Sequence, residues 1–174
     1  MNRPLLIGQA PGPRTDPELP LFPVPKTSAG GRLQELTGLR RVEYMKRFER
    51  VNLLPYFPGK HKRDDKFPMS PAKLTAAVLK PLLAGRVVIM VGRNVSNAFG
   101  FEADWHEWVD WPVVKVAVGD TPHSARVAVI PHPSGRNHWY NREQHREQAR
   151  SFWAEFLGQE TKKLLSSGDD GSKT

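Results

Sequence analysis

The stretch Val87-Val88-Ile89-Met90-Val91, which ends at Gly92, decides the fold that this chain is expected to adopt. It is a continuous apolar run of strand length, which is typical of a strand buried on both faces, as in a parallel sheet. Similar runs occupy residues 5–7, 51–54 and 126–130, each ending at a glycine or a proline, and residues 113–118 alternate partly. The pattern therefore predicts several short strands of one central sheet.

Helical patterns lie between these runs. Ser70 followed by Pro71 is a helix-start signal and predicts a helix over residues 70–83. Gly38 closes a predicted helix over residues 31–36, and further helices are predicted over residues 94–99 and 141–157. This alternation predicts an α/β protein, a three-layer α/β/α sandwich with a short, mainly parallel central sheet. We expect one domain over residues 1–165 and a disordered polar tail over residues 166–174.

The composition excludes several classes of protein. The 174 residues include no cysteine, which excludes disulfides, zinc–thiolate sites and cysteine-ligated iron–sulfur clusters. No apolar run has the length needed to cross a bilayer, and the first residues lack the apolar stretch of a signal peptide. We therefore expect a soluble, cytoplasmic protein without a membrane partner.

The charge of the chain points to a polyanionic partner. The formal net charge is +8, and eight lysines and arginines lie between residues 40 and 63 against Glu43 and Glu49. A solvated face of a basic protein is the plain interpretation, but interleaved aromatic side chains favour a nucleic-acid face. The cations are Arg40, Arg41, Lys46, Arg47, Arg50, Lys60, Lys62 and Arg63, and the aromatic residues are Tyr44, Phe48, Tyr56 and Phe57.

Two loops directly after predicted strands carry the residues best suited to chemistry, because ligands of such sheets bind at the carboxyl ends of the strands. The first loop is Gly8-Gln9-Ala10-Pro11-Gly12; its glycines allow a close approach of the backbone to a ligand, and it lacks the ending of a P-loop. The second loop is Pro131-His132-Pro133-Ser134-Gly135-Arg136-Asn137-His138. Two prolines fix the backbone around His132, which indicates a functional histidine.

Together the two loops resemble the signature motifs of the uracil-DNA glycosylase superfamily. The resemblance extends from residue 5 to about residue 157. Three further segments are similar to parts of that superfamily, namely Ser28-Ala29-Gly30-Gly31-Arg32-Leu33, Arg50-Val51-Asn52-Leu53-Leu54-Pro55 and Val88-Ile89-Met90-Val91-Gly92-Arg93. The resemblance implies a monofunctional DNA glycosylase, which flips a base out of DNA and hydrolyses its N-glycosidic bond to leave an abasic site.

The resemblance also implies roles for individual residues. His132 would donate a hydrogen bond to the base carbonyl oxygen where negative charge develops, and Asn52 would read the edge of the base through its amide. Arg136 stands where the superfamily inserts a wedge into the gap left by the flipped base. The other residues so implied are Gly8, Ala10, Phe22 and Phe57 for the base, and Ser134, Gly135, Asn137, Lys60, Lys62 and Arg63 for the DNA.

The first motif departs from the family pattern, because related families place Asp, Asn or Glu where this chain has Gln9. Glutamine can hold a water molecule but cannot accept its proton. Three interpretations stay open: formation of the sugar cation does most of the work while Gln9 orients water, a carboxylate such as Asp16 or Asp64 serves instead, or the departing base is a different one. Taken singly, each of these two acids is more simply explained as a solvated loop residue.

The basic loop over residues 58–66 is similar in place and charge to the loop of members that trap uracil-DNA covalently through a histidine. His61 does not match that pattern cleanly, so phosphate binding is the favoured role and covalent trapping the minor alternative.

Uracil is the substrate that the resemblance implies by default. A modified pyrimidine, such as glucosylated hydroxymethylcytosine of phage DNA, would make the protein an antiviral defence enzyme instead of a DNA-repair enzyme. The competing classes are a non-catalytic binder of abnormal bases and a general nucleic-acid binder. We expect a monomer associated with the nucleoid, with single- or double-stranded DNA as its partner and with neither cofactor nor metal.

Overall fold

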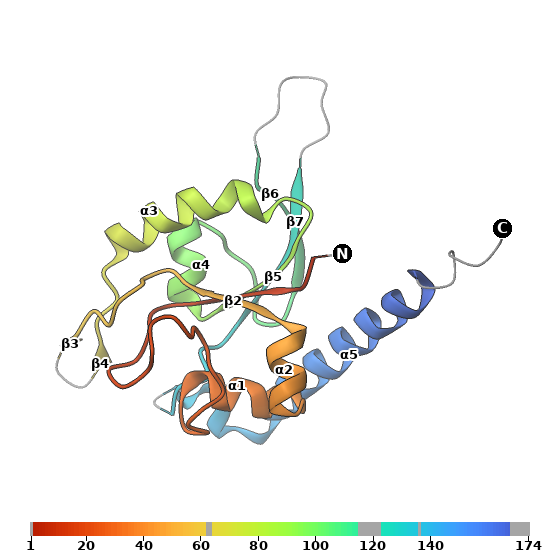
Figure 1. Ribbon diagram of the computed structural model, residues 1–174, viewed down its shortest axis with the longest axis horizontal. Helices are drawn as coiled ribbons and strands as arrows, with labels where there is room; N and C mark the ends of the chain where they lie inside the picture. Colours follow the sequence, from red (N-terminus) through yellow and green to blue (C-terminus); the bar gives the residue numbers. More distant parts are fainter. Residues whose placement is uncertain (1, 62–63, 115–122, 136, 168–174) are drawn as a thin grey trace.

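The computed structural model describes residues 2–61, 64–114, 123–135 and 137–167. Its centre is a five-stranded sheet with the order β2-β1-β5-β7-β6 (Figure 1). The strands are β1 (Leu5–Gly8), β2 (Glu49–Asn52), β5 (Val87–Val91), β6 (Trp108–Pro112) and β7 (Ser124–Ile130). Neighbouring strands are parallel except β6, which runs antiparallel to β7 at one edge. The predicted α/β class with a mainly parallel sheet is confirmed.

Helices cover both faces of the sheet, as continuous apolar strands require. One core lies under α3 (Met69–Leu79) and α4 (Arg93–Phe99) and includes Ile7, Val88 and Met90. The other lies under α1 (Ala29–Thr37), α2 (Arg41–Arg47) and α5 (Glu143–Ser167) and includes Leu6 and Ile89. Alternate residues of β1 and β5 therefore enter opposite cores. The remaining elements are η1 (Lys80–Leu83), η2 (His138–Asn141) and the short antiparallel pair β3 (Lys60–His61) and β4 (Asp64–Asp65).

Several boundaries differ from the sequence-based expectation. The helix expected from residue 70 begins at Met69, so Ser70 is not its N-cap; Pro71 fits in the first turn, where backbone N–H groups have no helical partner. The edge strand is β6 at Trp108–Pro112 and not residues 113–118, of which 115–118 lie outside the described residues. Helix α5 continues to Ser167, so residues 166 and 167 belong to it and not to the expected tail. Residues 168–174 lie outside the described part of the chain.

Gly30 fixes how α1 packs against the segment before it. An added Cβ at this position would lie 2.3 Å from the carbonyl oxygens of both Leu21 and Phe22. Backbone atoms cannot rotate away as a side chain can, so we expect Gly30→Ala to lower the free energy of unfolding by about 3 kcal/mol. Gly158 in α5 has open space around its Cβ position, so Gly158→Ala should instead raise stability by about 0.5–1 kcal/mol. Urea unfolding of both variants checks the pair, and equal effects would contradict the packing argument.

Candidate active site

The carboxyl ends of β1, β2 and β7 border a cavity of about 540 Å³. Hydrogen bonds beyond the strand ends hold the loops at this edge: Leu53 donates its N–H to the carbonyl of Gly8, and Leu54 donates to that of Gln9. Its lining residues include members of α1 and of the β3–β4 pair, two elements that are labelled in Figure 1. The predicted site residues that line it are Gln9, Ala10, Phe22, Asn52, Phe57, Lys60, His132, Ser134 and Gly135.

Asn52 and Gly8 are paired across β1 and β2, which sets the polar end of the cavity. The Oδ1 atom of Asn52 is buried and has no hydrogen-bond partner among the described residues. A buried acceptor without a donor is costly, so this atom is suited to receive a hydrogen bond from a ligand. An added Cβ at Gly8 would lie 2.4 Å from that Oδ1, so only glycine leaves the asparagine in place.

Gln9 is oriented by a residue from a different loop. The Nδ2 of Asn94, at the start of α4, donates to the Oε1 of Gln9 over 3.3 Å. This contact occupies the acceptor side of the Gln9 amide and leaves its Nε2 as a donor. An added Cβ at Gly92 would lie 2.7 Å from that Nε2 and 3.1 Å from the Cβ of His132, and Gly92 also has a φ of 102°. Gly92 therefore permits the close approach of the two motif loops.

The loop that carries His132 is fixed by its own polar side chains. The Nδ2 of Asn137 donates to the carbonyl of His132 over 2.8 Å, and its Oδ1 accepts from the N–H of Trp139 over 3.0 Å. The hydroxyl of Tyr140 donates to the carbonyl of Pro131 over 2.7 Å. Asn137 is therefore committed to shaping the loop, and it is not among the residues that line the 540 Å³ cavity.

His132 is held in its neutral form. Burial lowers the pKa of its imidazole to about 4, against an opposing effect of the nearby Asp65 carboxylate. A neutral imidazole at pH 7 has one N–H to donate and carries no charge into the cavity. The ring can therefore act as a hydrogen-bond donor to a developing anion without first losing a proton.

The carboxylate at the cavity is not one of the two that the sequence suggested. Asp16 is exposed, accepts from the N–H of Glu18 over 2.9 Å, and is not a lining residue of the cavity. The side chain of Asp64 lies outside the described part. Asp65, which the sequence reasoning missed, does line the cavity. Asp65 is paired with Lys60, a second lining residue, across the β3–β4 pair.

Cations surround the same cavity. Two of them, Arg14 and Arg32, were not among the predicted site residues, and Lys66 follows β4. Arg32 lies against the second motif loop, since an added Cβ at Gly135 would be 2.7 Å from its Nη2. Together with Lys60 these residues outnumber Asp65, so the rim is positive and attracts phosphates. Lys62, Arg63 and Arg136 lie outside the described residues, as does the side chain of His61.

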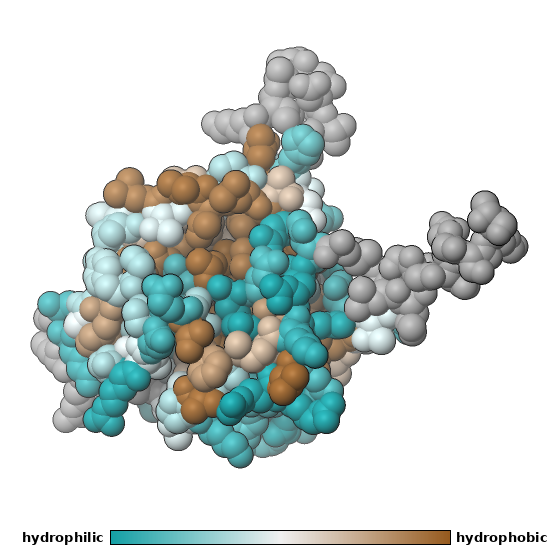
Figure 2. Space-filling view, in the orientation of Figure 1, coloured by the Kyte–Doolittle hydropathy of each residue, from teal (hydrophilic) through white to brown (hydrophobic). Residues whose placement is uncertain are grey.

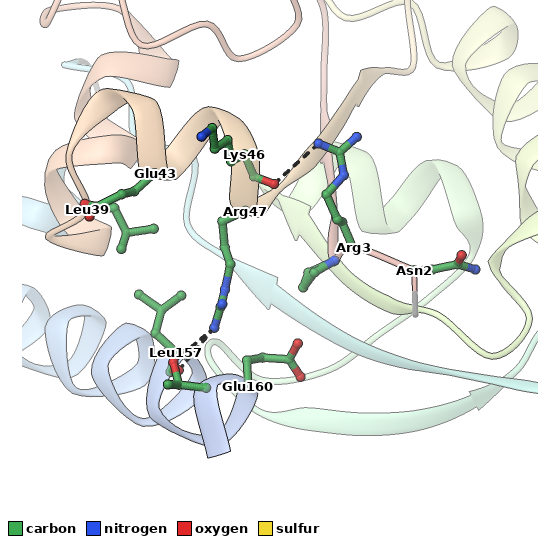
Figure 3. Close-up of a pocket in the computed structure, with 10 residues that line it drawn as sticks. Asn2, Arg3, Leu39, Glu43, Lys46, Arg47, Leu157 and Glu160 are labelled. Atoms are coloured by element: carbon green, nitrogen blue, oxygen red, sulfur yellow. Dashed lines mark hydrogen bonds between the residues drawn. The ribbon is translucent and has the colours of Figure 1, made fainter. Parts of the chain in front are cut away.

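Several cations of the basic segment over residues 40–63 make contacts within the fold. Arg40, which directly precedes α2, pairs with Glu43, while Arg50 donates to the carbonyls of Met45 and Phe48. Figure 3 shows Arg47 reaching from α2 to the carbonyl of Leu157 in α5. The Arg47 contact borders a second cavity of about 470 Å³, beside the amino ends of β1 and β2 and thus opposite the candidate site. Arg47 therefore connects α2 to α5, whereas Lys60 lies at the candidate site.

Two histidines should make the protein less stable in acid. Burial lowers the pKa of His132 and of His106 to about 4, the latter with a contribution from His145. Both ring nitrogens of His106 are buried without a partner among the described residues, between the rings of Trp139 and Phe152. As the pH falls below 6.5, the unfolded chain takes up protons first, so stability is lost between about pH 6.5 and pH 4.

Each histidine should lower the free energy of unfolding by at most about 1.4 kcal/mol per pH unit in this window. Urea unfolding from about pH 7.5 to pH 4.5 measures the decline. His106→Phe should reduce its slope, whereas substitution of the exposed His123 should not. A stability that stays constant across this range would contradict the assigned burial.

Comparison with protein-family models finds no match, and neither does comparison with curated proteins. In the part of the chain that the structure describes, no helix is long and apolar enough to span a membrane. Nor do the described residues include a group of three or more side chains arranged to hold a metal ion. The assignment of function therefore depends on the chemistry of the cavity itself.

Proposed function

We propose that the protein is a monomeric DNA glycosylase, similar to the uracil-DNA glycosylase superfamily, that removes uracil or a modified pyrimidine from DNA. The observation that carries the proposal is one cavity lined by Asn52, His132 and Gln9, which lie at or just beyond the carboxyl ends of three different strands, β2, β7 and β1. Its unpaired Asn52 acceptor, neutral imidazole donor and cationic rim match three needs of base excision: reading a base edge, stabilising the departing anion and holding the DNA backbone.

Asn52 and the aromatic lining residues would bind the extruded base. A pyrimidine imide presents an N–H between two carbonyls, so its N–H can donate to the Asn52 Oδ1 while a carbonyl accepts from the Nδ2. Phe22, Phe57 and Phe67 line the same cavity and offer faces on which a base can stack. The cost of leaving the DNA stack, a few kcal/mol, would be offset by these contacts.

His132 would stabilise the leaving base. When the bond between the sugar C1′ and the base nitrogen breaks, the electron pair goes to the base and negative charge collects on its carbonyl oxygen. A neutral imidazole N–H aimed at that oxygen lowers the barrier, and one such donor contributes about 3–4 kcal/mol. The water oxygen then forms the new bond to C1′, and its proton leaves to an acceptor.

This site differs from sites whose first motif carries a carboxylate, because another group must accept that proton. Gln9 has no acidic group, and its Oε1 accepts from Asn94, so its role in this scheme is to hold water or base through Nε2. Asp65 is a carboxylate that lines the cavity, and it is our candidate for receiving the proton. If the sugar cation forms before water attacks, the proton transfer is late and the demand on this carboxylate is small.

A non-catalytic binder of abnormal bases is the second candidate, favoured by Gln9, an amide that leaves the first motif without a proton acceptor. Abasic-site formation, read by strand scission in hot alkali, separates the two. The DNAs to compare contain uracil in single and double strands, hypoxanthine, glucosylated hydroxymethylcytosine, or no modification.

Cleavage of the uracil strands would support a repair glycosylase, and cleavage of only the glucosylated DNA would support a defence enzyme. Binding of these DNAs without any scission would contradict the glycosylase proposal in favour of the binder. A complex that survives denaturant would point to covalent trapping.

A further inference from the structure

Helix α3 and η1 carry an exposed apolar stripe. Leu74, Val78 and Leu82 are 71%, 70% and 64% exposed, and their spacing of four residues puts them on one helical face. The opposite face packs Ala72 and Ala76 into the core. Figure 2 shows a hydrophobic patch that runs along α3 and continues down towards β2. Exposed apolar residues that form a contiguous patch mark an interaction site, whereas apolar residues scattered singly over a surface do not.

The stripe ends in a groove. A hollow of about 410 Å³ lies between η1 and β2, the last strand of the sheet on this side, and Leu82 belongs to both stripe and groove. Its lining combines apolar side chains, which can contact a large side chain from outside, with charged ones. The lining residues are Arg3, Leu5, Phe48, Glu49, Arg50, Val51, Leu79, Leu82, Leu83 and Arg86. None of them lines the candidate active site.

The charges around this surface have one predominant sign. No aspartate or glutamate occurs from Lys66 to Arg86, a segment that also contains Lys73 and Lys80. At the groove, Glu49 is paired with both Arg86 and Arg3. Arg50 adds a further positive charge, so the groove remains cationic. An occupant must therefore combine apolar side chains with acidic ones.

We infer that the stripe and groove, defined by Leu74, Val78, Leu82 and the groove lining above, bind an amphipathic helix of a partner protein with acidic flanks. Its apolar face would cover the stripe, and one large side chain would enter the groove, as in helix-in-groove recognition. Its carboxylates would face the groove cations Arg3, Arg50 and Arg86. DNA is a poor occupant, because protein–DNA interfaces are polar. A second copy is disfavoured, because its own groove arginines would meet these.

A synthetic helical peptide tests the inference without a known partner. The probe has leucines at positions i, i+3, i+4 and i+7 and glutamates elsewhere; a matched peptide has lysines in place of the glutamates. In an NMR titration of the full chain, the acidic peptide should shift amide signals of residues 73–86 and 49–51 and leave residues 8–12 unchanged. It should bind roughly tenfold tighter than the lysine peptide.

Substitutions then locate the surface. Leu74→Gln with Val78→Gln keeps good helix formers on an exposed face and should weaken peptide binding roughly tenfold. Val42→Gln, at a site 63% exposed on α2, is the matched control and should bind as the wild type does. Base release should be the same in all three proteins, so this result is independent of the glycosylase proposal.

Equal binding of the two peptides, or signal shifts confined to other residues, would overturn the inference. So would a concentration-dependent dimer, measured by light scattering, that the Leu74→Gln/Val78→Gln variant abolishes, because the stripe would then be covered by a second copy.

Discussion

His132→Ala is expected to slow single-turnover base release by roughly 100- to 1000-fold, the effect of removing one donor from a site of developing negative charge. DNA affinity should change little, because the cations of the rim, Arg14, Arg32, Lys60 and Lys66, remain in place. Rates measured with enzyme in excess over uracil-containing DNA, alongside a filter-binding titration, separate the two quantities.

Two further variants make this result specific. His132→Gln keeps an N–H donor of similar reach and should recover part of the lost rate. His123→Ala removes an exposed histidine remote from the cavity lining and should release the base at the wild-type rate. Because His132 is neutral down to about pH 4, the rate should not fall with an apparent pKa near 6.5. An unchanged rate in a folded His132→Ala protein would remove this residue from the mechanism.

Asn52→Ala is expected to reduce kcat/KM by roughly 100-fold, since both hydrogen bonds to the base edge are lost together. Affinity for a strand with the recognised base should also fall, whereas affinity for an abasic-site analogue, which has no base edge to read, should change less. Competition between a uracil strand and an abasic strand measures this difference directly.

Gly8→Ala should reduce kcat/KM similarly by moving the asparagine, because the added Cβ would lie only 2.4 Å from the Asn52 Oδ1 and would push it aside. Asn97→Ala, at an exposed position of α4, is the matched asparagine control and should leave kcat/KM unchanged. If Asn52→Ala discriminated bases as well as the wild type does, another group would have to read the base.

Local sequence patterns were sufficient for the framework of the fold. The apolar runs that form β1, β5 and β7 were predicted as buried strands because an uninterrupted apolar run can be recognised without tertiary information. Gly38 ends α1 with a φ of 68°, as its position after a helical pattern predicted. The loops after β1 and β7 were placed at one edge because parallel strands share their carboxyl edge.

Weakly patterned elements were not predictable. Helix α2 buries only Tyr44 among its side chains, so it has almost no apolar period, and its cations were interpreted as part of a DNA face. The structure pairs Arg40 with Glu43 and places Arg47 and Arg50 against backbone carbonyls of the fold. Sequence alone cannot separate a cation that binds a partner from one that contacts a neighbouring helix, because both are polar residues on a short segment.

The sequence by itself determined the α/β class, the loops at the carboxyl edge of the sheet, and Gln9, Asn52 and His132 as candidates that share one cavity. Only the tertiary structure decided that Asp65 lines the cavity, that Arg14 and Arg32 join its rim, and that Asn94 orients Gln9. It also exposed Leu74 and Val78, which the helical pattern does not distinguish from core residues. The physical reason is that strand and helix periods are local, whereas contacts between loops depend on strand register and on how helices pack.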